Sequence, residues 1–555
     1  MNTVIVAIVG LAWLYFAYRW YARRIDQRII QPDDTRPTPG TEVNDNRDYV
    51  PTRPLVLFGH HFSSIAGAGP IVGPILALAL FGWLPALIWI LVGSVFVGAV
   101  HDYTALMVSI RHRGVSIVEI AGTAISNTAR WVLSAFVWFA LVLVQAVFAV
   151  LCAQTLTEKP EIVIPTLGIV ALAILFGAGV YKRILNFSVG TVLALGAMVA
   201  LIFIGQRVPI EASYNFWLVV FIGYAFIAAI LPVWVLLQPR DYLSVYILLA
   251  GMVLGFGGLF VFHPSFNAPA LHAVSSTQGP IWPMLFIVVA CGAASGFHCL
   301  VSSGTTAKQL NRESDGRKIA FGGMLTEGAL AMLVVLIIGG ALYWKEAPTA
   351  AVSGYVFQDL LGQSANIAFG TALGRVMGSL GIPIAIGTAF GVLMLNAFIL
   401  TTLDTTVRLS RYIVQETAGQ KVAFFRNPYV AAGLGLALAF YFCIGGNWKI
   451  IWPLFGASNQ LVAALALMVV TAYFIAVKKP TLYTFIPAVF MVITTEAALI
   501  YQLFWIFLPD GKWVLSVVAI FLMLLGLMVT YEVFRKFRVA FGNGRRVARD
   551  VAPQA

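Results

Sequence analysis

Two adjacent histidines lie inside an apolar stretch near the start of the chain. His60 and His61 belong to the segment 59–74 (GHHFSSIAGAGPIVGP), which mixes hydroxyl groups with glycines and prolines. Glycine loosens a helix and proline lacks an N–H, so this segment leaves backbone polar groups unpaired. In hydrocarbon such groups survive only against protein or a water-filled cavity, and interrupted spans of this kind form substrate and ion sites in secondary transporters. The segment therefore predicts a transport site at membrane depth.

Five further ionisable residues lie in other apolar runs, namely His101, Asp102, His298, Glu327 and Asp404. A charged group at the bilayer centre costs about 2.5–3.5 kcal/mol on insertion scales, so such groups normally face one another or water. We therefore expect them to converge with the histidine pair. A structural alternative stays open, because a lone membrane histidine often only bonds a neighbouring helix, and His101 with Asp102 can form an interfacial pair.

Three chemistries suit such a cluster. Histidine titrates near neutrality and can relay a coupling proton with Asp102 or Glu327. Several neutral imidazoles and a carboxylate can bind Zn²⁺ or another transition metal, although no H-x-x-x-H or H-E-x-x-H spacing supports this option. A protonated histidine can also pair with a substrate carboxylate.

Two more polar strings lie at membrane depth. Residues 401–406 (TTLDTT) combine hydroxyls with one carboxylate, which suits a hard cation or a proton, although such hydroxyls also bond back to helical carbonyls. Residues 455–460 (FGASNQ) place two amides beside a glycine, and amides suit peptide groups or hold helices together. Glu496 is a further candidate carboxylate, with fewer polar residues near it in the sequence.

These observations define three sets of candidate residues. The substrate-binding set is His60, His61, Ser63, Ser64, Gly67, Gly69, His298, Ser302, Ser303, Ser458, Asn459 and Gln460. The ion-coupling set is His101, Asp102, Glu327, Thr401, Thr402 and Asp404. The alternative metal set is His60, His61, His101, Asp102 and His298.

The elements that position these residues follow from composition. Hydrophobic residues make up 60% of the 555 and charged residues 10%, and the mean hydropathy is +0.89, which indicates a polytopic all-α membrane protein. The net charge of +12 lies mostly in short loops, a topology signal rather than a nucleic-acid patch. The sequence contains no Walker A loop, G-x-S-x-G elbow or dinucleotide fingerprint, so we expect neither an enzyme nor an ATP-driven pump. The 4 cysteines are interpreted as buried core residues.

Apolar runs of suitable length predict about 15 transmembrane helices. Their expected bounds are 3–21, 55–81, 83–109, 131–151, 162–180, 186–205, 214–237, 243–262, 281–304, 319–343, 380–407, 428–445, 450–477, 483–507 and 513–534. Basic clusters, including Arg240 and the run from Arg408 to Arg426, fall in every second connection. This alternation predicts an outer N-terminus and a cytoplasmic C-terminus.

The chain divides into four expected parts. Residues 1–21 form an anchor helix, 22–54 a polar cytoplasmic linker, 55–534 the transmembrane transporter domain and 535–555 a basic cytoplasmic tail. Residues 263–280 are expected to form an outer loop, and 350–379 an outer interfacial or re-entrant helix. The segments 59–67 and 296–304 share a Gly/His/Ser pattern on spans of opposite direction, as an inverted repeat requires.

The strings 59–74, 295–298 (SGFH), 302–305 (SSGT), 401–404 and 455–460 together resemble the carbon starvation protein A (CstA) family, in order and over most of the chain. The resemblance implies a bacterial inner-membrane protein that imports peptides under carbon starvation, with relatives that take up pyruvate with protons. It also implies an inverted-repeat core with broken helices, as in the amino acid/polyamine/organocation transporters.

We therefore expect a secondary transporter that imports a short peptide or a small carboxylate, coupled to protons or Na⁺. Its partners are the small-molecule substrate, the coupling ion and the bilayer, with no nucleic acid. No cofactor is expected apart from an optional transition-metal ion at the histidines. The alternative is a membrane metal or redox protein that uses the intramembrane histidines as ligands.

Overall fold

The computed structural model describes residues 1–181, 184–346, 349–444 and 448–542. Within these residues the chain is helical except for loops and one antiparallel hairpin of two short strands, β1 (Ser275–Ser276) and β2 (Gly279–Pro280). The helices of the first half are α1 (Thr3–Phe16), α2 (Arg23–Ile25), α3 (Pro39–Glu42), α4 (Pro54–Ile65), α5 (Gly69–Phe81), α6 (Trp83–Gly93), α7 (Ala99–Arg111), α8 (Ile117–Ala124), α9 (Asn127–Glu158), α10 (Val163–Tyr181), α11 (Phe187–Arg207), α12 (Tyr214–Ile230) and α13 (Leu237–Phe262).

The second half of the chain is also helical. Its helices are α14 (Ile281–Val288), α15 (Gly296–Val301), α16 (Ala307–Gln309), α17 (Gly322–Ala341), α18 (Phe357–Gln363), α19 (Ala365–Gly378), α20 (Ile384–Glu416), α21 (Ala418–Lys421), α22 (Pro428–Cys443), α23 (Trp448–Ala476), α24 (Leu482–Gln502) and α25 (Trp513–Gly542). Stretches of π-helix join several of them into longer helices, at Ala17–Ala22, Asp26–Ile30, Ser94–Gly98, Ser302–Thr306, Arg317–Phe321 and Leu503–Phe507.

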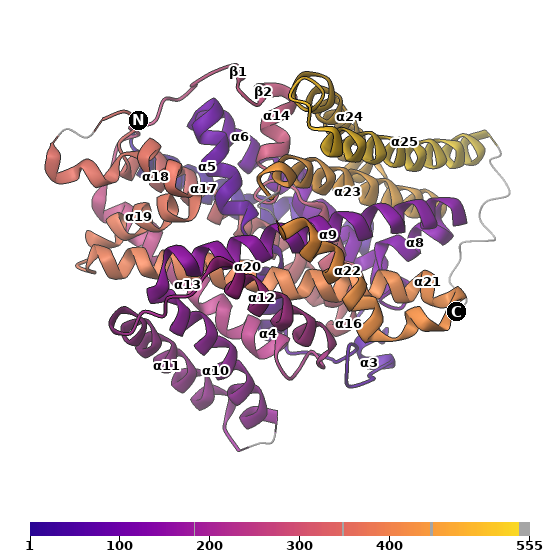
Figure 1. The fold of residues 1–555 in the computed structure, drawn as a ribbon. Helices are drawn as coiled ribbons and strands as arrows, with labels where there is room; N and C mark the ends of the chain where they lie inside the picture. Colours follow the sequence, from indigo (N-terminus) through magenta and orange to yellow (C-terminus); the bar gives the residue numbers. More distant parts are fainter. Residues whose placement is uncertain (182–183, 347–348, 445–447, 543–555) are drawn as a thin grey trace.

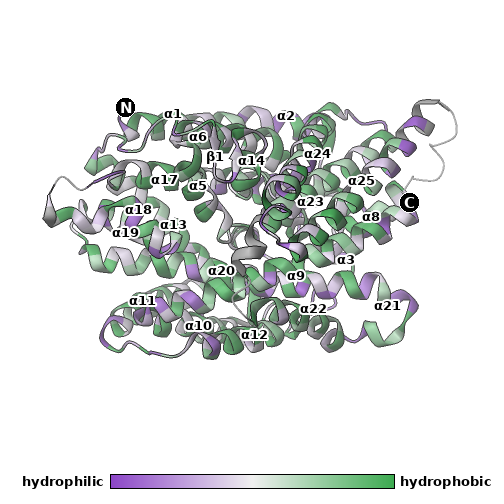
Figure 2. Ribbon diagram, turned by 45° about the horizontal axis from the view of Figure 1, so that its top comes forward, coloured by the Kyte–Doolittle hydropathy of each residue, from purple (hydrophilic) through white to green (hydrophobic). Residues whose placement is uncertain are grey.

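The described residues contain 12 helices that are long and apolar enough to cross a membrane. They are Thr3–Ile30, Pro54–Phe81, Trp83–Arg111, Asn127–Glu158, Pro160–Val180, Phe187–Arg207, Leu237–Phe262, Glu313–Ala341, Ile384–Lys421, Leu454–Ala476, Leu482–Phe507 and Trp513–Lys536. Green, apolar residues accordingly dominate most helices in Figure 2, whereas purple residues gather at helix ends such as those near α21. The three other expected spans correspond to the shorter helices α12 and α22 and to the interrupted pair α14 and α15.

The centre of the bundle and its edge differ in burial. In the most apolar stretches of Glu313–Ala341 and Leu454–Ala476, 89% of the residues are buried, against 22% in Phe187–Arg207. Figure 1 shows α10 and α11 side by side at the edge of the molecule. The core therefore forms around α17 and α23, while the α10–α11 pair presents much of its surface outward.

The first helix is longer than expected. It continues without a break to Ile30, because Ala22, Ile25 and Ile29 recur at helical spacing and are buried in the core. The linker between the first two spans therefore comprises residues 31–53, not 22–54. At the other end α25 continues to Gly542, and the rest of the predicted tail lies outside the described residues.

The region 350–379 forms two short helices, of which α19 is largely buried. A Cβ on Gly374 would lie 2.7 Å from the carbonyl oxygen of Ile384, so α19 packs directly on the backbone of α20. This burial favours the re-entrant over the interfacial interpretation.

Candidate functional site

The predicted interruption of the second span is present, and the ninth expected span is interrupted too. Residues 66–68 separate α4 from α5, and residues 289–295 separate α14 from α15. The two interruptions touch, because a Cβ on Gly69 would lie 2.3 Å from Sγ of Cys291. The absence of a side chain at Gly69 therefore allows the two broken helices to meet in the interior.

A buried group that we term the Arg240 network lies beside the first interruption. It consists of His60, Tyr224, Arg240, Asp241 and Asp404. His60 Nδ1 lies 2.6 Å from Asp241 Oδ2, and Arg240 Nη2 lies 2.6 Å from Asp241 Oδ1. Arg240 also pairs with both carboxylate oxygens of Asp404, at 3.1 Å for Nη2 and Oδ1, and Tyr224 donates a hydrogen bond of 3.0 Å to Asp404.

The charges of this network do not cancel in the ordinary protonation states. One guanidinium faces two carboxylates, and the side chains of Arg240, Asp241 and Asp404 are at most 1% exposed. Because an uncompensated buried charge is costly, a further positive charge near this group matters, and Arg408, one turn along α20 from Asp404, also acts on that carboxylate.

A second buried group, the His298 network, consists of His101, Asp102, His298 and Glu327. Asp102 bridges the two histidines, at 2.8 Å from His101 Nδ1 and 3.0 Å from His298 Nδ1. His298 Nε2 lies 3.3 Å from Glu327 Oε2, a distance that suits an ion pair. Neither oxygen of Glu327 has a hydrogen-bond partner among the described residues. The ionisable residues thus gather in two networks, not in one cluster.

One ring nitrogen of His61 has a hydrogen-bond partner and the other has none. Its Nδ1 is 2.9 Å from the hydroxyl of Thr306, while His60 Nε2 is 3.1 Å from the hydroxyl of Thr305, so adjacent histidines contact adjacent threonines of one π-helical stretch. The Nε2 of His61 and the hydroxyl of Ser302 are buried and have no partner in the described part of the chain. These two atoms are therefore buried polar groups that the described helices leave without a hydrogen bond.

The hydroxyls at the end of α4, just before the first interruption, bind neighbouring helices. Ser63 donates to the carbonyl of Asp241 at 3.1 Å, and Ser64 lies 3.3 Å from the hydroxyl of Thr405. Thr402 donates to the carbonyl of Ser64 at 3.0 Å, and a Cβ on Gly67 would lie 2.8 Å from the same threonine hydroxyl. Helix α20 therefore packs directly against the interruption.

Other candidate hydroxyls bond back within their own helices. Thr401 donates to Ala397 at 2.9 Å, Ser458 to Phe455 at 3.1 Å, and Ser303 to Cys299 at 2.7 Å. Each hydroxyl therefore bonds to a carbonyl of its own helix, as hydroxyls in membrane spans commonly do.

The two amides of α23 hold the second interruption in place. Asn459 Oδ1 accepts a hydrogen bond of 2.9 Å from the backbone N–H of Phe297, and its Nδ2 donates to Ser295 Oγ at 3.0 Å. Gln460 donates to the carbonyl of Phe286 at 3.0 Å. Both polar groups of Asn459 are therefore engaged by the broken helix, whereas Gln460 Oε1 is buried and has no partner among the described residues.

The sequence interpretation placed Arg240 and Arg408 in cytoplasmic loops, and both placements are wrong. Arg240 lies in the first turn of α13, and Arg408 lies within α20, where it donates to the carbonyls of Ala228 and Leu231 at 2.7 and 2.6 Å. Both side chains are buried. Helix α13 begins six residues earlier than expected, since proline is tolerated in a first helical turn and Pro239 therefore does not end the helix.

The sequence did not identify Asp241 and Tyr224 as candidate site residues, for a related reason. Asp241 follows Pro239 and Arg240, and this proline-and-charge pattern is typical of a loop. The only available signal was the short distance between two apolar runs, which leaves little room for a solvated loop. Tyr224 has no local signal, because its role depends on Asp404 in another helix.

Among the described residues, no group of three or more His, Cys, Asp or Glu side chains is arranged to hold a metal ion, so the alternative metal set does not fit such a site. Glu496 is buried against Gly526 of α25, and its oxygens have no hydrogen-bond partner among the described residues. It joins neither network.

A family model described as "Carbon starvation protein CstA" matches residues 2–358 and 356–498. The chain belongs to this family. The CstA family relatives include a peptide transporter CstA of Bacillus subtilis, 32% identical over 97% of this chain and 97% of that protein. They also include a pyruvate/proton symporter BtsT of Escherichia coli, 33% identical over 90% of this chain and 81% of that protein.

The fold of this CstA family chain is similar to that of a solved transporter. A crystal structure of the Eremococcus coleocola manganese transporter aligns with a TM-score of 0.54 over 89% of this chain and 99% of that one, at 11% identity. At that identity the similarity concerns the fold alone. The chain is thus a multi-pass inner-membrane protein of a transporter family and not an enzyme, as expected.

Proposed function

We propose that the protein imports short peptides or small carboxylates such as pyruvate by secondary active transport. The names of its relatives, peptide transporter and pyruvate/proton symporter, support this choice of substrates. The observation that carries it is the contact between two interrupted helices beside the buried Arg240 network, because unpaired backbone and charged groups at membrane depth are typical of transport sites. We also retain about 15 spans, an outer N-terminus and an inverted repeat as parts of the proposal.

The geometry favours the proton over Na⁺ as the coupling ion. Asp404, the carboxylate expected to bind a hard cation, is paired with the guanidinium of Arg240, which would repel a sodium ion. The Arg240 network instead lacks one positive charge, and a proton on His60 supplies it. The His298 network, with two histidines and two carboxylates, is a second candidate for proton transfer.

Substrate contacts are assigned to the interrupted helices. His61 Nε2 and Ser302 Oγ are buried polar atoms without partners in the described residues, so they are the first choice for binding a carboxylate or peptide group. Asn459 is assigned a positioning role, because its side chain already binds the second broken helix. Gln460 binds the same helix through Nε2, and its buried Oε1, without a partner in the described residues, stays a candidate for a substrate contact.

The deciding experiment is uptake of labelled pyruvate and a labelled dipeptide into proteoliposomes under imposed proton or Na⁺ gradients. Saturable accumulation driven by a proton gradient would support the proposal and name the substrate class. Accumulation driven by Na⁺ alone would overturn the assignment of the coupling ion. No accumulation of either compound under any gradient would overturn the function itself.

A further inference from the structure

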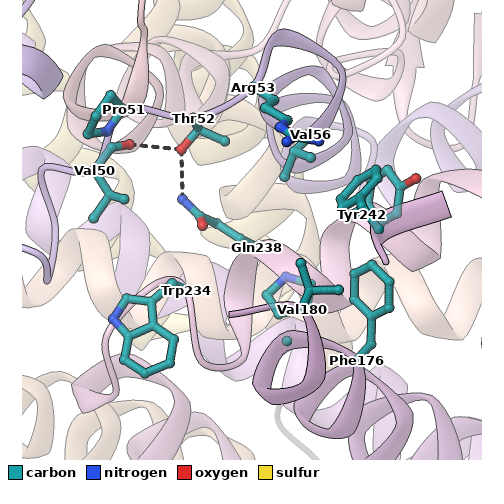
Figure 3. A pocket seen from close by; sticks show the side chains of 13 residues that line it. Val50, Pro51, Thr52, Arg53, Val56, Phe176, Val180, Trp234, Gln238 and Tyr242 are labelled. Atoms are coloured by element: carbon teal, nitrogen blue, oxygen red, sulfur yellow. Dashed lines mark hydrogen bonds between the residues drawn. The ribbon is translucent and has the colours of Figure 1, made fainter. Parts of the chain in front are cut away.

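A pocket of about 260 Å³ lies where the end of the linker meets the helices beside it. Residues 50–53 line one side of the pocket, and Trp234 and Phe176 line the opposite side, as Figure 3 shows. Tyr242 of α13 and Phe187 of α11 complete the wall. The rings of Phe176, Phe187 and Tyr242 lie against one another, with centroids 5.1, 5.7 and 5.9 Å apart, so they form one aromatic surface.

The pocket lies at a boundary between membrane and water, because the ends of four spans meet there. These spans are Pro54–Phe81, Pro160–Val180, Phe187–Arg207 and Leu237–Phe262. Of the residues that line the pocket, Arg53 precedes the first span, Val180 ends the second and Phe187 begins the third. By the topology proposed above this is the cytoplasmic boundary, where the leaflet contains anionic lipids.

Arg53 brings a positive charge to the pocket. Its side chain is exposed, and its guanidinium carbon lies 5.2 Å from the centroid of the Phe187 ring. Within the part of the chain that the structure describes, no Asp or Glu lines the pocket. The polar side chains of Thr52 and Gln238 are hydrogen-bonded to each other at 2.8 Å. The guanidinium is therefore the group of this wall that suits a phosphate, which it can bind through two parallel hydrogen bonds.

The rest of the wall consists mostly of aliphatic and aromatic side chains. A free phosphate would use only the corner beside Arg53 and would leave this apolar surface facing water, whereas hydrocarbon attached to the phosphate would cover it. The adjoining face of α11 is apolar as well. Val189, Val192 and Leu193 follow Phe187 along that helix and are 53%, 70% and 59% exposed. An apolar surface for an acyl chain thus lies next to the pocket.

The pocket is also adjacent to the Arg240 network. Tyr242 lines the pocket, and its neighbour Asp241 lies 2.6 Å from His60 of α4. A Cβ on Gly59 would lie 3.3 Å from Cα of Tyr242, so α4 and α13 pack closely here. A ligand that binds Arg53 and packs on Tyr242 would therefore touch both helices and favour their present arrangement.

We propose that this pocket binds an anionic phospholipid of the cytoplasmic leaflet. The phosphate pairs with Arg53, the first carbons of a chain pack on Phe176 and Phe187, and the bound lipid stabilises the packing of α4 on α13. The lipid is a ligand separate from the transported substrate, so its binding does not depend on which substrate the protein carries.

The test reconstitutes the full chain into phosphatidylcholine vesicles that contain a small fraction of phosphatidylglycerol with a photoactivatable group on one acyl chain. After illumination, the labelled peptides are mapped by mass spectrometry. The parent protein is compared with Arg53→Gln and Arg113→Gln. Arg113 is the matched control, because it is also an exposed arginine beside the linker, 3.6 Å from Glu42, and does not line the pocket.

We expect labelling of the pocket residues of α10 and α11 to fall about fivefold or more in Arg53→Gln, because hydrogen bonds between charged groups are lost, and by less than about twofold in Arg113→Gln. Unlabelled phosphatidylglycerol should compete, whereas inorganic phosphate should not. Equal labelling in the two variants would show only non-specific lipid around the bundle, and competition by inorganic phosphate would show a site for a free anion. Either result would overturn the proposal.

Val180→Trp tests the same pocket without changing its charge. Val180 is half-buried and lines the pocket, so a larger ring at this position takes up the space of the lipid. We expect labelling around the pocket to fall about fivefold in this variant too, because the bulky ring excludes the chain. Unchanged labelling would overturn the placement of the lipid in the pocket.

A second measurement concerns the stabilising role of the lipid. In detergent, added phosphatidylglycerol should raise the unfolding temperature of the parent protein above the value with phosphatidylcholine, because a ligand that binds only the folded state stabilises it. The same addition should leave Arg53→Gln nearly unchanged. Equal shifts in the two proteins would overturn the stabilisation by a lipid bound at Arg53.

Discussion

Arg240 and Asp404 lie 164 residues apart in the chain and form an ion pair that is almost completely excluded from solvent. The pair joins α13 to α20, and its second carboxylate neighbour, Asp241, connects it to His60 in the broken helix. A single guanidinium thus sets the charge of the residues around the first interruption. This relationship places one buried guanidinium between two carboxylates.

Neutralising Asp404 should separate transport from coupling. In Asp404→Asn, Arg240 and Asp241 balance each other, so the proton that we propose on His60 is no longer needed. We expect the variant to exchange labelled substrate across the membrane but to lose proton-driven accumulation by about tenfold or more. Counterflow and gradient-driven uptake in the same proteoliposomes measure the two activities, and undiminished accumulation would contradict the charge count.

Removing the guanidinium of Arg240 should lower the stability of the protein more than removing the carboxylate of Asp404. Arg240→Gln leaves two buried carboxylates facing each other, so we expect a loss of about 3–5 kcal/mol of stability. The double variant Arg240→Gln with Asp404→Asn keeps only Asp241 beside His60 and should recover part of this loss. Thermal unfolding in detergent measures both, and a double variant less stable than Arg240→Gln alone would refute the pairing.

His61→Ala should abolish uptake while expression and folding stay largely intact. The substitution removes a buried nitrogen that has no partner in the described residues and leaves a single threonine hydroxyl unpaired. The matched control is His263→Ala, because His263 is an exposed loop residue outside both networks. Normal uptake by His61→Ala would move the substrate site elsewhere.

Asn459→Ala tests a positioning role against a substrate contact. The substitution leaves the N–H of Phe297 and the hydroxyl of Ser295 without their amide partner, which should cost about 1–3 kcal/mol of stability. Because the second broken helix would lose its fixed position, we expect a lower maximal rate and a nearly unchanged KM. A raised KM at normal stability would instead indicate that Asn459 contacts the substrate.

Asp48 of the linker is paired with Arg408 and Arg411 of α20, and its contribution to stability should depend on pH in one direction. Its folded-state pKa of about 2 lies below the usual 3.8, so its stabilising effect is fully present above pH 3.8 and is lost as the pH falls towards 2. The difference in unfolding temperature between the parent protein and Asp48→Asn should therefore be constant from about pH 8 to 5 and narrow below about pH 4. A difference that narrows already between pH 7 and 5 would contradict the ion pair.

Local patterns in the sequence were sufficient for several features. The glycines and prolines of residues 59–74 predicted the first interruption, because these residue types weaken a helix wherever they occur. The match between 59–67 and 296–304 pointed to a second special segment, and the chain is interrupted just before it, at residues 289–295. The excess of apolar residues over charged ones was enough to place the chain in a membrane.

Only the tertiary structure decided which polar residues meet. Arg240 follows a proline and precedes an aspartate, so its local sequence is typical of a loop, and only packing against Asp404 and Tyr224 makes its burial tolerable. Asn459 has the chemistry of a substrate ligand, yet its amide is used by a helix end more than 160 residues away in the chain. The sequence by itself determined which segments are apolar, interrupted or polar, because those properties depend on neighbours along the chain. The pairing of charges depends on contacts between distant helices, and no local pattern encodes it.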